Sequence, residues 1–240
     1  MFPMKHLTTP SLSILIAASA FAQSAPAAAT AWSQTHNVAL STDYVFRGIS
    51  QNGSSNGLSI SGGTDIAHTS GFSVGFWASN QNVNEVGNES IEADVYAAFA
   101  FKLGAVDMSL GGISYFYPGA SDFNTSEVNL GAAYAGLSLK ASYALTKYFN
   151  FNDSEGTTYV DLSYSYTFSS LKDLAVGLHY GWTLGEGTQF DYEDYNVGLS
   201  YPLLGYTASL AYTDANALGI NYTGKVLDKG IVVFSMTKTF

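Results

Sequence analysis

The sequence contains no cysteine, so neither a disulfide framework nor a thiolate metal site is available to this chain. Charged residues are also scarce. They make up 12% of the 240 residues, about half the usual share in soluble proteins. Basic residues are the scarcest, with nine Lys and Arg against 19 Asp and Glu and a net charge of −10. Because nucleic-acid binding needs clustered Lys and Arg, this balance argues against nucleic acid as a partner.

Long apolar runs are missing from most of the chain. The exception, Leu12–Ala22, follows the basic residue Lys5 and ends in the small-x-small pattern of residues 20–22, which is typical of a secretory signal peptide. The run is shorter than the roughly 20 apolar residues that a transmembrane helix needs. We therefore expect residues 1–22 to be a cleaved signal peptide. Residues 23–240 would then form a single exported domain with a net charge of −11, because the signal removes one lysine.

What the chain has in abundance is alternation between apolar and small or polar residues. In the stretch TYVDLSYSYTF, for example, Val160, Leu162 and Tyr164 alternate with Asp161 and Ser163. This period of two recurs without a comparable helical period, so the sequence predicts an all-β protein. The expected strands cover residues 36–47, 57–67, 71–80, 90–103, 105–117, 126–135, 137–149, 157–168, 173–184, 191–201, 205–213 and 230–240.

Two kinds of connection separate the expected strands. Longer polar segments such as NGSSN and NFNDSEG alternate with short turns such as LGA and AG, as in up-and-down membrane barrels. A secreted β-sandwich would also alternate, but here aromatic residues cluster toward strand ends, as interfacial girdles require. The sequence therefore predicts a transmembrane up-and-down antiparallel outer-membrane β-barrel of about 12 strands. Residues 214–229 are expected to form an external loop, although 217–225 would also fit a further strand.

The stretch TDYVFRGISQ, residues 42–51, places two charges in an apolar strand. Continuing the alternation of the first strand puts Tyr44 and Phe46 on the lipid-facing side and Asp43 and Arg47 on the lumen side. The two charges would then lie roughly 13 Å apart along the strand, so each must find partners elsewhere. Arg47 is expected near the pore mouth, where the strand meets the first external loop.

The two ends of the chain resemble a known family. STDYVFRGISQ near the mature N-terminus and VVFSMTKTF at the C-terminus are similar to the TorF-type porins of proteobacteria, also known as the Gcw_chp conserved hypothetical proteins. A terminal Phe that closes an alternating strand also resembles the C-terminal signature of bacterial outer-membrane barrels. The resemblance implies an outer-membrane barrel with a channel function, and it brings no established substrate or catalytic residue.

The inner face of the expected barrel carries the candidate functional residues. These lumen and selectivity candidates are Asp43, Arg47, Asp65, Glu92, Asp94, Lys102, Glu127, Lys140, Asp161 and Asp194. Acidic residues exceed basic ones, and carboxylates in a channel favour cations. We therefore expect a porin for passive diffusion of small hydrophilic solutes with a weak cation preference. The alternative is a non-conducting structural or adhesive barrel, in which the same charges pair and brace a plugged interior.

A hydrolase embedded in the barrel wall is a third hypothesis. Ser165, His179 and Asp161 share the lumen side of neighbouring strands and supply the residue types of a catalytic triad. Serine is common on every inner face, however, so we expect no enzyme and no catalytic residue. His36 and His68, at periplasmic strand ends, lack a third ligand for a metal, and the glycines form no phosphate-binding loop. No cofactor or metal is therefore expected.

The expected localisation is the outer membrane of a Gram-negative bacterium, reached through a Sec-type signal peptide. The expected partners there are outer-membrane lipid and lipopolysaccharide, small solutes or ions, and the barrel-assembly machinery, which would bind the strand that ends in Phe240. An oligomer is compatible with the sequence, which identifies neither the oligomeric state nor the solute.

Overall fold

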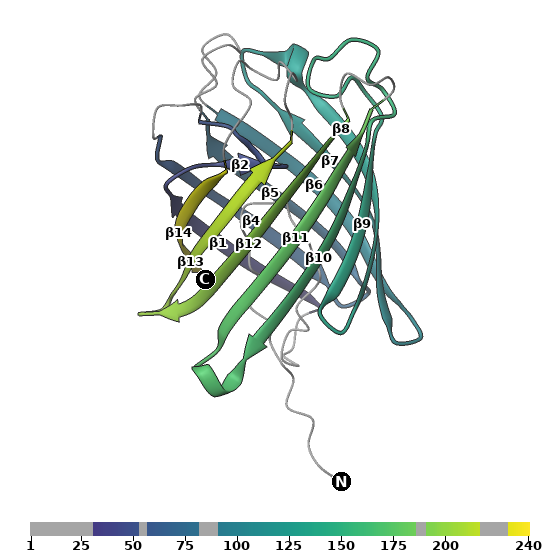
Figure 1. Ribbon diagram of the computed structural model, residues 1–240. Helices are drawn as coiled ribbons and strands as arrows, with labels where there is room; N and C mark the ends of the chain where they lie inside the picture. Colours follow the sequence, from purple (N-terminus) through teal and green to yellow (C-terminus); the bar gives the residue numbers. More distant parts are fainter. Residues whose placement is uncertain (1–30, 53–56, 82–90, 186–190, 217–229) are drawn as a thin grey trace.

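The computed structural model describes residues 31–52, 57–81, 91–185, 191–216 and 230–240. Twelve strands form one closed barrel of antiparallel neighbours (Figure 1). They are β1 (Trp32–Ser41), β4 (Ser59–His68), β5 (Phe72–Asn80), β6 (Ile91–Leu103), β7 (Val106–Phe116), β8 (Thr125–Tyr134), β9 (Leu137–Ala144), β10 (Thr158–Phe168), β11 (Leu174–Leu184), β12 (Tyr192–Leu203), β13 (Tyr206–Ala215) and β14 (Ile231–Thr239). The predicted all-β barrel of about 12 strands is confirmed.

Four shorter elements complete the described chain. Strands β2 (Val45–Phe46) and β3 (Ile49–Ser50) pair only with each other. The 3-10 turns η1 (Ser121–Phe123) and η2 (Ser169–Leu171) lie in the connections before β8 and before β11. None of the helical segments in the described residues is long and apolar enough to cross a membrane.

Strand β1 closes the barrel, because it pairs with β4 on one side and with β14 on the other. The backbone groups of His36 and Phe240 exchange two hydrogen bonds, with N–O distances of 3.2 and 2.9 Å. Full closure pairs the backbone of each barrel strand on both sides and so removes free sheet edges. Lys238 on β14 donates from Nζ to the carbonyl oxygen of Gly205 at 2.8 Å, so its charge lies at a turn beside the C-terminal end of the chain.

The alternation seen in the sequence separates two faces of the barrel wall. Large apolar side chains point outward and are exposed, among them Val38, Leu40, Val95, Phe99, Phe101, Leu130, Leu139, Tyr166, Leu199, Leu210 and Phe234. The intervening positions point inward and carry small or polar side chains. A continuous apolar outer surface of this kind suits lipid, because proteins in water rarely expose contiguous apolar patches this large.

Tight turns connect the strands at the end of the barrel that carries the C-terminus. Ala135 and Gly136 between β8 and β9 have φ angles of 51° and 86°, and Leu204 and Gly205 between β12 and β13 have 53° and 80°. Two consecutive positive φ values are characteristic of type I′ turns, whose twist matches that of paired strands. The connections at the opposite end are longer, as the sequence predicted.

Two strands end earlier than the alternation predicted. The first was expected to continue to residue 47, but β1 ends at Ser41. The seventh was expected to continue to residue 149, but β9 ends at Ala144. Beyond Ser41 apolar and polar residues keep alternating while the chain turns into the lumen, so the period of two does not mark the end of β1. Beyond Ala144 the alternation stops, because two polar residues, Thr146 and Lys147, are followed by two aromatic ones. The further strand considered at residues 217–225 lies outside the described residues, as does the expected signal peptide.

Candidate functional site

The segment that follows β1, residues 42–52, forms a hairpin inside the barrel, which we call the lumen hairpin (Figure 1). Its two-residue turn consists of Arg47 and Gly48, with φ angles of 47° and 77°, the pattern of a type I′ turn. At its base, the Ser50 hydroxyl donates to both carboxylate oxygens of Asp43, at 3.0 and 2.8 Å. Burial raises the pKa of Asp43, and the hydrogen bonds from Ser50 partly oppose this shift.

The aromatic residues of the lumen hairpin are buried, which corrects their predicted position. Tyr44 and Phe46 were expected to face lipid, but they are only 2% and 6% exposed and lie inside the barrel. Tyr44 packs edge-to-face on Trp77 with ring centroids 5.4 Å apart, and Phe46 contacts Tyr115 in the same way at 5.6 Å. The hairpin therefore contributes to an aromatic core in the lumen rather than to an interfacial girdle.

A second segment, residues 145–157 between β9 and β10, also turns inward and completes this core. The Phe149 backbone N–H donates to the Thr125 hydroxyl at 2.8 Å, and that of Tyr148 donates to the Ser154 hydroxyl at 2.8 Å. The resulting cluster, which we call the aromatic plug, consists of Tyr44, Phe46, Ile49, Ile113, Tyr115, Tyr117, Ala144, Tyr148, Phe149, Tyr192 and Ala215. Because these residues come from opposite parts of the wall and from both inward segments, the plug crosses the lumen.

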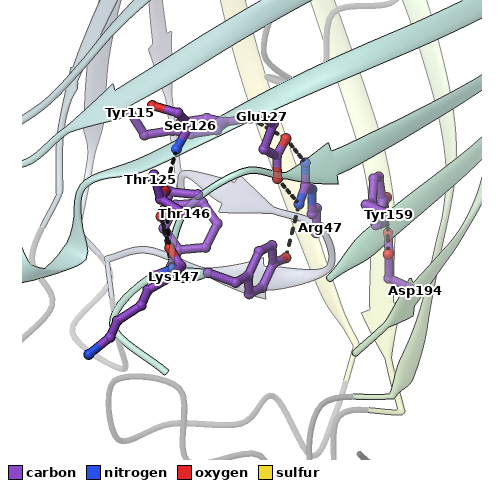
Figure 2. A network of polar contacts seen from close by, with 11 residues as sticks. Arg47, Tyr115, Thr125, Ser126, Glu127, Thr146, Lys147, Tyr159 and Asp194 are labelled. Carbon is purple, nitrogen blue, oxygen red and sulfur yellow. Dashed lines mark hydrogen bonds and ion pairs between the residues drawn. The ribbon is translucent and has the colours of Figure 1, made fainter. Parts of the chain in front are cut away.

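Arg47 connects the lumen hairpin to the wall through a buried ion pair (Figure 2). Its Nη1 and Nη2 donate to Oε1 and Oε2 of Glu127 on β8 at 2.8 and 2.7 Å, a bidentate arrangement. Nη1 also donates to the Tyr148 hydroxyl at 3.0 Å. The guanidinium carbon lies 4.2 Å from the ring centre of Tyr159 on β10. Arg47 is therefore buried inside the lumen, 6% exposed, near the ends of β8 and β10 that carry the longer connections.

Two more predicted acidic residues, Glu92 and Asp94, lie on β6 beside the lumen hairpin and are buried. The hydroxyl of Tyr44 donates to Glu92 Oε1 at 2.6 Å, and that of Tyr117 donates to Oε2 at 2.7 Å. Asp94 is different, because neither of its carboxylate oxygens receives a hydrogen bond in the described part of the chain. The two neighbouring carboxylates thus have unequal surroundings.

A second polar network, on β10 to β12, is organised around His179. Its Nε2 lies 2.9 Å from Asp194 Oδ1, and its Nδ1 lies 3.4 Å from Asp161 Oδ2. The Tyr159 hydroxyl donates to Asp194 Oδ2 at 3.1 Å (Figure 2). Lys140 on β9 lies opposite Asp161 in the strand register. Since the guanidinium of Arg47 stacks on Tyr159, the two networks meet at the lumen hairpin.

Inward-facing glycines allow polar side chains on non-adjacent strands to meet. The Tyr96 hydroxyl on β6 donates to Asp65 Oδ1 on β4 at 2.7 Å by passing over Gly75 on β5, where a Cβ would lie 2.2 Å from the tyrosine ring. In the same way, Gly181 on β11 leaves room for the contact between its neighbours' side chains, Tyr159 and Asp194. The last predicted lumen residue, Lys102, pairs with Asp107 at a turn and is largely exposed.

The structure brings together a serine, a histidine and two aspartates, but not the set that the sequence suggested. Ser165 lies opposite Gly177, whereas Ser163 lies opposite His179. The Ser163 Oγ is 3.2 Å from His179 Nδ1, yet its hydroxyl donates to Asp161 Oδ1 at 2.6 Å. The hydroxyl proton is therefore directed at a carboxylate rather than at the imidazole that a hydrolase would use as its base.

The histidines at the strand ends are held apart by the strand register. His36 pairs with Thr64, and its Nδ1 lies 2.9 Å from that hydroxyl, while His68 pairs with Trp32 and packs on its ring. In the described part of the chain, no group of three or more His, Cys, Asp or Glu residues has a geometry that could hold a metal ion.

Comparison with known proteins gives one family and several similar folds. A family model described as "Bacterial protein of unknown function (Gcw_chp)" matches residues 25–240. Among solved structures, a KdgM porin in complex with disordered oligogalacturonate is similar with a TM-score of 0.53 and 12% identity, over 87% of this chain and 98% of that chain. A NanC porin is similar with a TM-score of 0.51 and 9% identity, over 86% of this chain and 98% of that one. The comparison with curated sequences finds no match. At these identities the structural likeness shows the fold.

Proposed function

Because the chain belongs to the Gcw_chp family, whose description assigns no activity, we propose a function from the geometry of its barrel. The protein is an outer-membrane porin-type channel through which small hydrophilic solutes diffuse passively, with a weak preference for cations. The lumen hairpin and the aromatic plug form the narrowest part of its path. No catalytic step is part of this function.

The observation that carries the proposal is the contrast between the two faces of one closed wall. The outer face presents large exposed apolar side chains, while the inner face carries polar and charged ones. Lipid outside and water inside satisfy both faces at once. An exported chain with this wall belongs in the outer membrane, which agrees with the apolar run near the N-terminus and the alternating C-terminal strand.

The cation preference rests on the acidic excess in the lumen. Asp65, Glu92, Asp94, Glu127, Asp161 and Asp194 line the inner wall, where the basic side chains facing them are Arg47, Lys140 and His179. Carboxylates along a narrow, low-dielectric path attract cations and repel anions. A polyanion such as the oligogalacturonate in the KdgM complex would be repelled by this lumen, so the shared fold does not carry over that ligand.

A second candidate function, a non-conducting structural barrel, is favoured by the aromatic plug. Its buried rings cross the lumen and are fixed by the Arg47–Glu127 pair. Such a barrel would act through its long external connections rather than by solute flow. The two functions differ in one measurable quantity, which is the ionic current through the refolded protein.

Planar-bilayer recording under a salt gradient tests the proposal. The wild type should conduct with a reversal potential that shows cation preference, and Arg47→Ala should increase that preference because it leaves Glu127 unpaired. A variant in which residues 43–51 are replaced by a glycine–serine linker should show a higher conductance. Anion selectivity of the wild type would contradict the proposal. A silent wild type with a conducting linker variant would support the structural barrel instead.

The absence of catalysis is tested separately. Phospholipase and esterase assays on refolded protein should give no turnover above that of His179→Ala. Activity that disappears in His179→Ala and also in Ser163→Ala would show that the polar network on β10 to β12 is catalytic.

A further inference from the structure

The charges around the lumen hairpin do not balance within the described residues. Three carboxylates, Glu92, Asp94 and Glu127, are almost fully buried, and the guanidinium of Arg47 pairs with Glu127. Both terminal nitrogens of Arg47 donate hydrogen bonds to the carboxylate of Glu127. Glu92 is stabilised by two tyrosine hydroxyls, one on each oxygen. Two negative charges therefore remain: that of Glu92, which the hydroxyls stabilise without neutralising, and that of Asp94, whose oxygens receive no hydrogen bond among the described residues.

Asp94 is placed where a ligand could complete its surroundings. It lies on the inner face of β6, opposite Trp77 on β5 and Tyr115 on β7 in the strand register. It is 1% exposed, and Glu92 and Glu127 are its electrostatic neighbours. A buried carboxylate without a donor is costly, and folded proteins pair such groups with a counter-charge or a metal ion. Two acidic neighbours make the potential at Asp94 more negative and favour a bound cation further.

The ligand set selects the kind of cation. Divalent ions need several converging acidic ligands, and the described residues contain no such group of three. Arg47 and the two hydroxyls already occupy the oxygens of Glu127 and Glu92, so Asp94 is the carboxylate of the three whose oxygens are free for a cation among the described residues. A monovalent alkali ion also takes oxygen ligands and needs fewer acidic ones, so this ligand set favours it over a divalent ion.

We propose that Asp94, with Glu92 beside it, binds a monovalent alkali cation between β6 and the lumen hairpin. The ion takes the position of the missing counter-charge and stabilises the folded barrel. If the protein conducts, a permeating cation binds transiently at the same site. The binding itself does not depend on conduction, so the porin proposal and this one can fail separately.

Equilibrium unfolding by urea in detergent micelles tests the site with Na⁺ as the probe. N-methyl-D-glucamine replaces Na⁺ at constant ionic strength, because this bulky cation cannot enter a buried site. A ligand that binds only the folded state stabilises it in proportion to the logarithm of its concentration. Above the dissociation constant, each tenfold increase in Na⁺ should therefore lower the unfolded-to-folded ratio of the wild type about tenfold.

Two matched variants make the result specific. Asp94→Asn keeps the side-chain shape and removes the charge, so its stability should not change when Na⁺ replaces the bulky cation. Asp65→Asn, which removes a carboxylate that already receives a hydrogen bond from Tyr96, should keep the full Na⁺ dependence. A wild type whose stability responds to pH and not to Na⁺ would show that Asp94 takes a proton instead, and would overturn the proposal. Equal Na⁺ dependence in Asp94→Asn and the wild type would overturn it as well.

Discussion

The ion pair between Arg47 and Glu127 is expected to be the most important polar contact of the lumen hairpin. Both side chains are buried, and two short hydrogen bonds join them. Replacing Arg47 with Met keeps a Cβ and a similar length, and therefore leaves the backbone strain at φ 47° unchanged. It also leaves the carboxylate of Glu127 buried without its counter-charge. Removing one partner of a buried pair costs about 3–5 kcal/mol.

The double variant Arg47→Met with Glu127→Met removes both charges. Comparing its free energy of unfolding with that of Arg47→Met shows how much of the loss comes from leaving Glu127 buried and unpaired. Replacing a whole buried pair with apolar residues of similar volume is often neutral or stabilising by about 1–4 kcal/mol. The double variant should therefore be clearly more stable than Arg47→Met alone. The cation–π contact with Tyr159 is lost in both variants and cancels in the comparison.

Urea titration of refolded protein in detergent micelles measures these free energies, with unchanged slopes as the check that the folded state is comparable. A cost below about 1 kcal/mol for Arg47→Met, a value typical of exposed pairs, would refute the reasoning. So would a double variant that is no more stable than Arg47→Met. In either case the hairpin would be held by its aromatic contacts and not by the buried charges.

Three further substitutions test other parts of the structure by the same urea titration. Gly48→Ala should destabilise by more than about 2 kcal/mol, because the residue has φ 77° and a new Cβ would lie 2.5 Å from the Asp194 Cβ. The pKa of Asp43 is raised above 3.8 by burial, so the folded state binds a proton that the unfolded chain has released. The stability this group contributes is therefore lost as pH rises from 3.8 through the raised pKa, and Asp43→Asn should remove that part of the pH dependence. Lys102→Ala should change stability by less than about 0.5 kcal/mol, because its pair with Asp107 is exposed.

The wall of the barrel could be predicted from the sequence because one physical rule governs it. Each barrel strand must be apolar toward lipid and small or polar toward the lumen, so the alternation fixes the face of each residue. Glu127, Asp161 and Asp194 were placed on the inner face for this reason, and the structure has them there.

The lumen hairpin could not be predicted by the same rule. Alternation shows which side chains are apolar, but it does not distinguish lipid from an aromatic core inside the barrel. Tyr44 and Phe46 fit both surroundings and were assigned to lipid. A local signal was present: in VF-RG-IS, β-branched and aromatic residues flank a dipeptide with glycine in its second position, as in a two-residue hairpin turn. The partners of Arg47 needed the register of strands far apart in the sequence, which a single sequence does not provide.

Selectivity should depend on the unpaired charges of the lumen rather than on the number of charged residues. Arg47 and Glu127 carry opposite charges less than 3 Å apart, so their fields largely cancel at a passing ion. The double variant Arg47→Met with Glu127→Met should therefore keep the reversal potential of the wild type, while Asp94→Asn should lower the cation preference. If the double variant shifts the reversal potential as far as Asp94→Asn does, paired charges also set the field. The unpaired charge of Asp94 would then not explain the preference by itself.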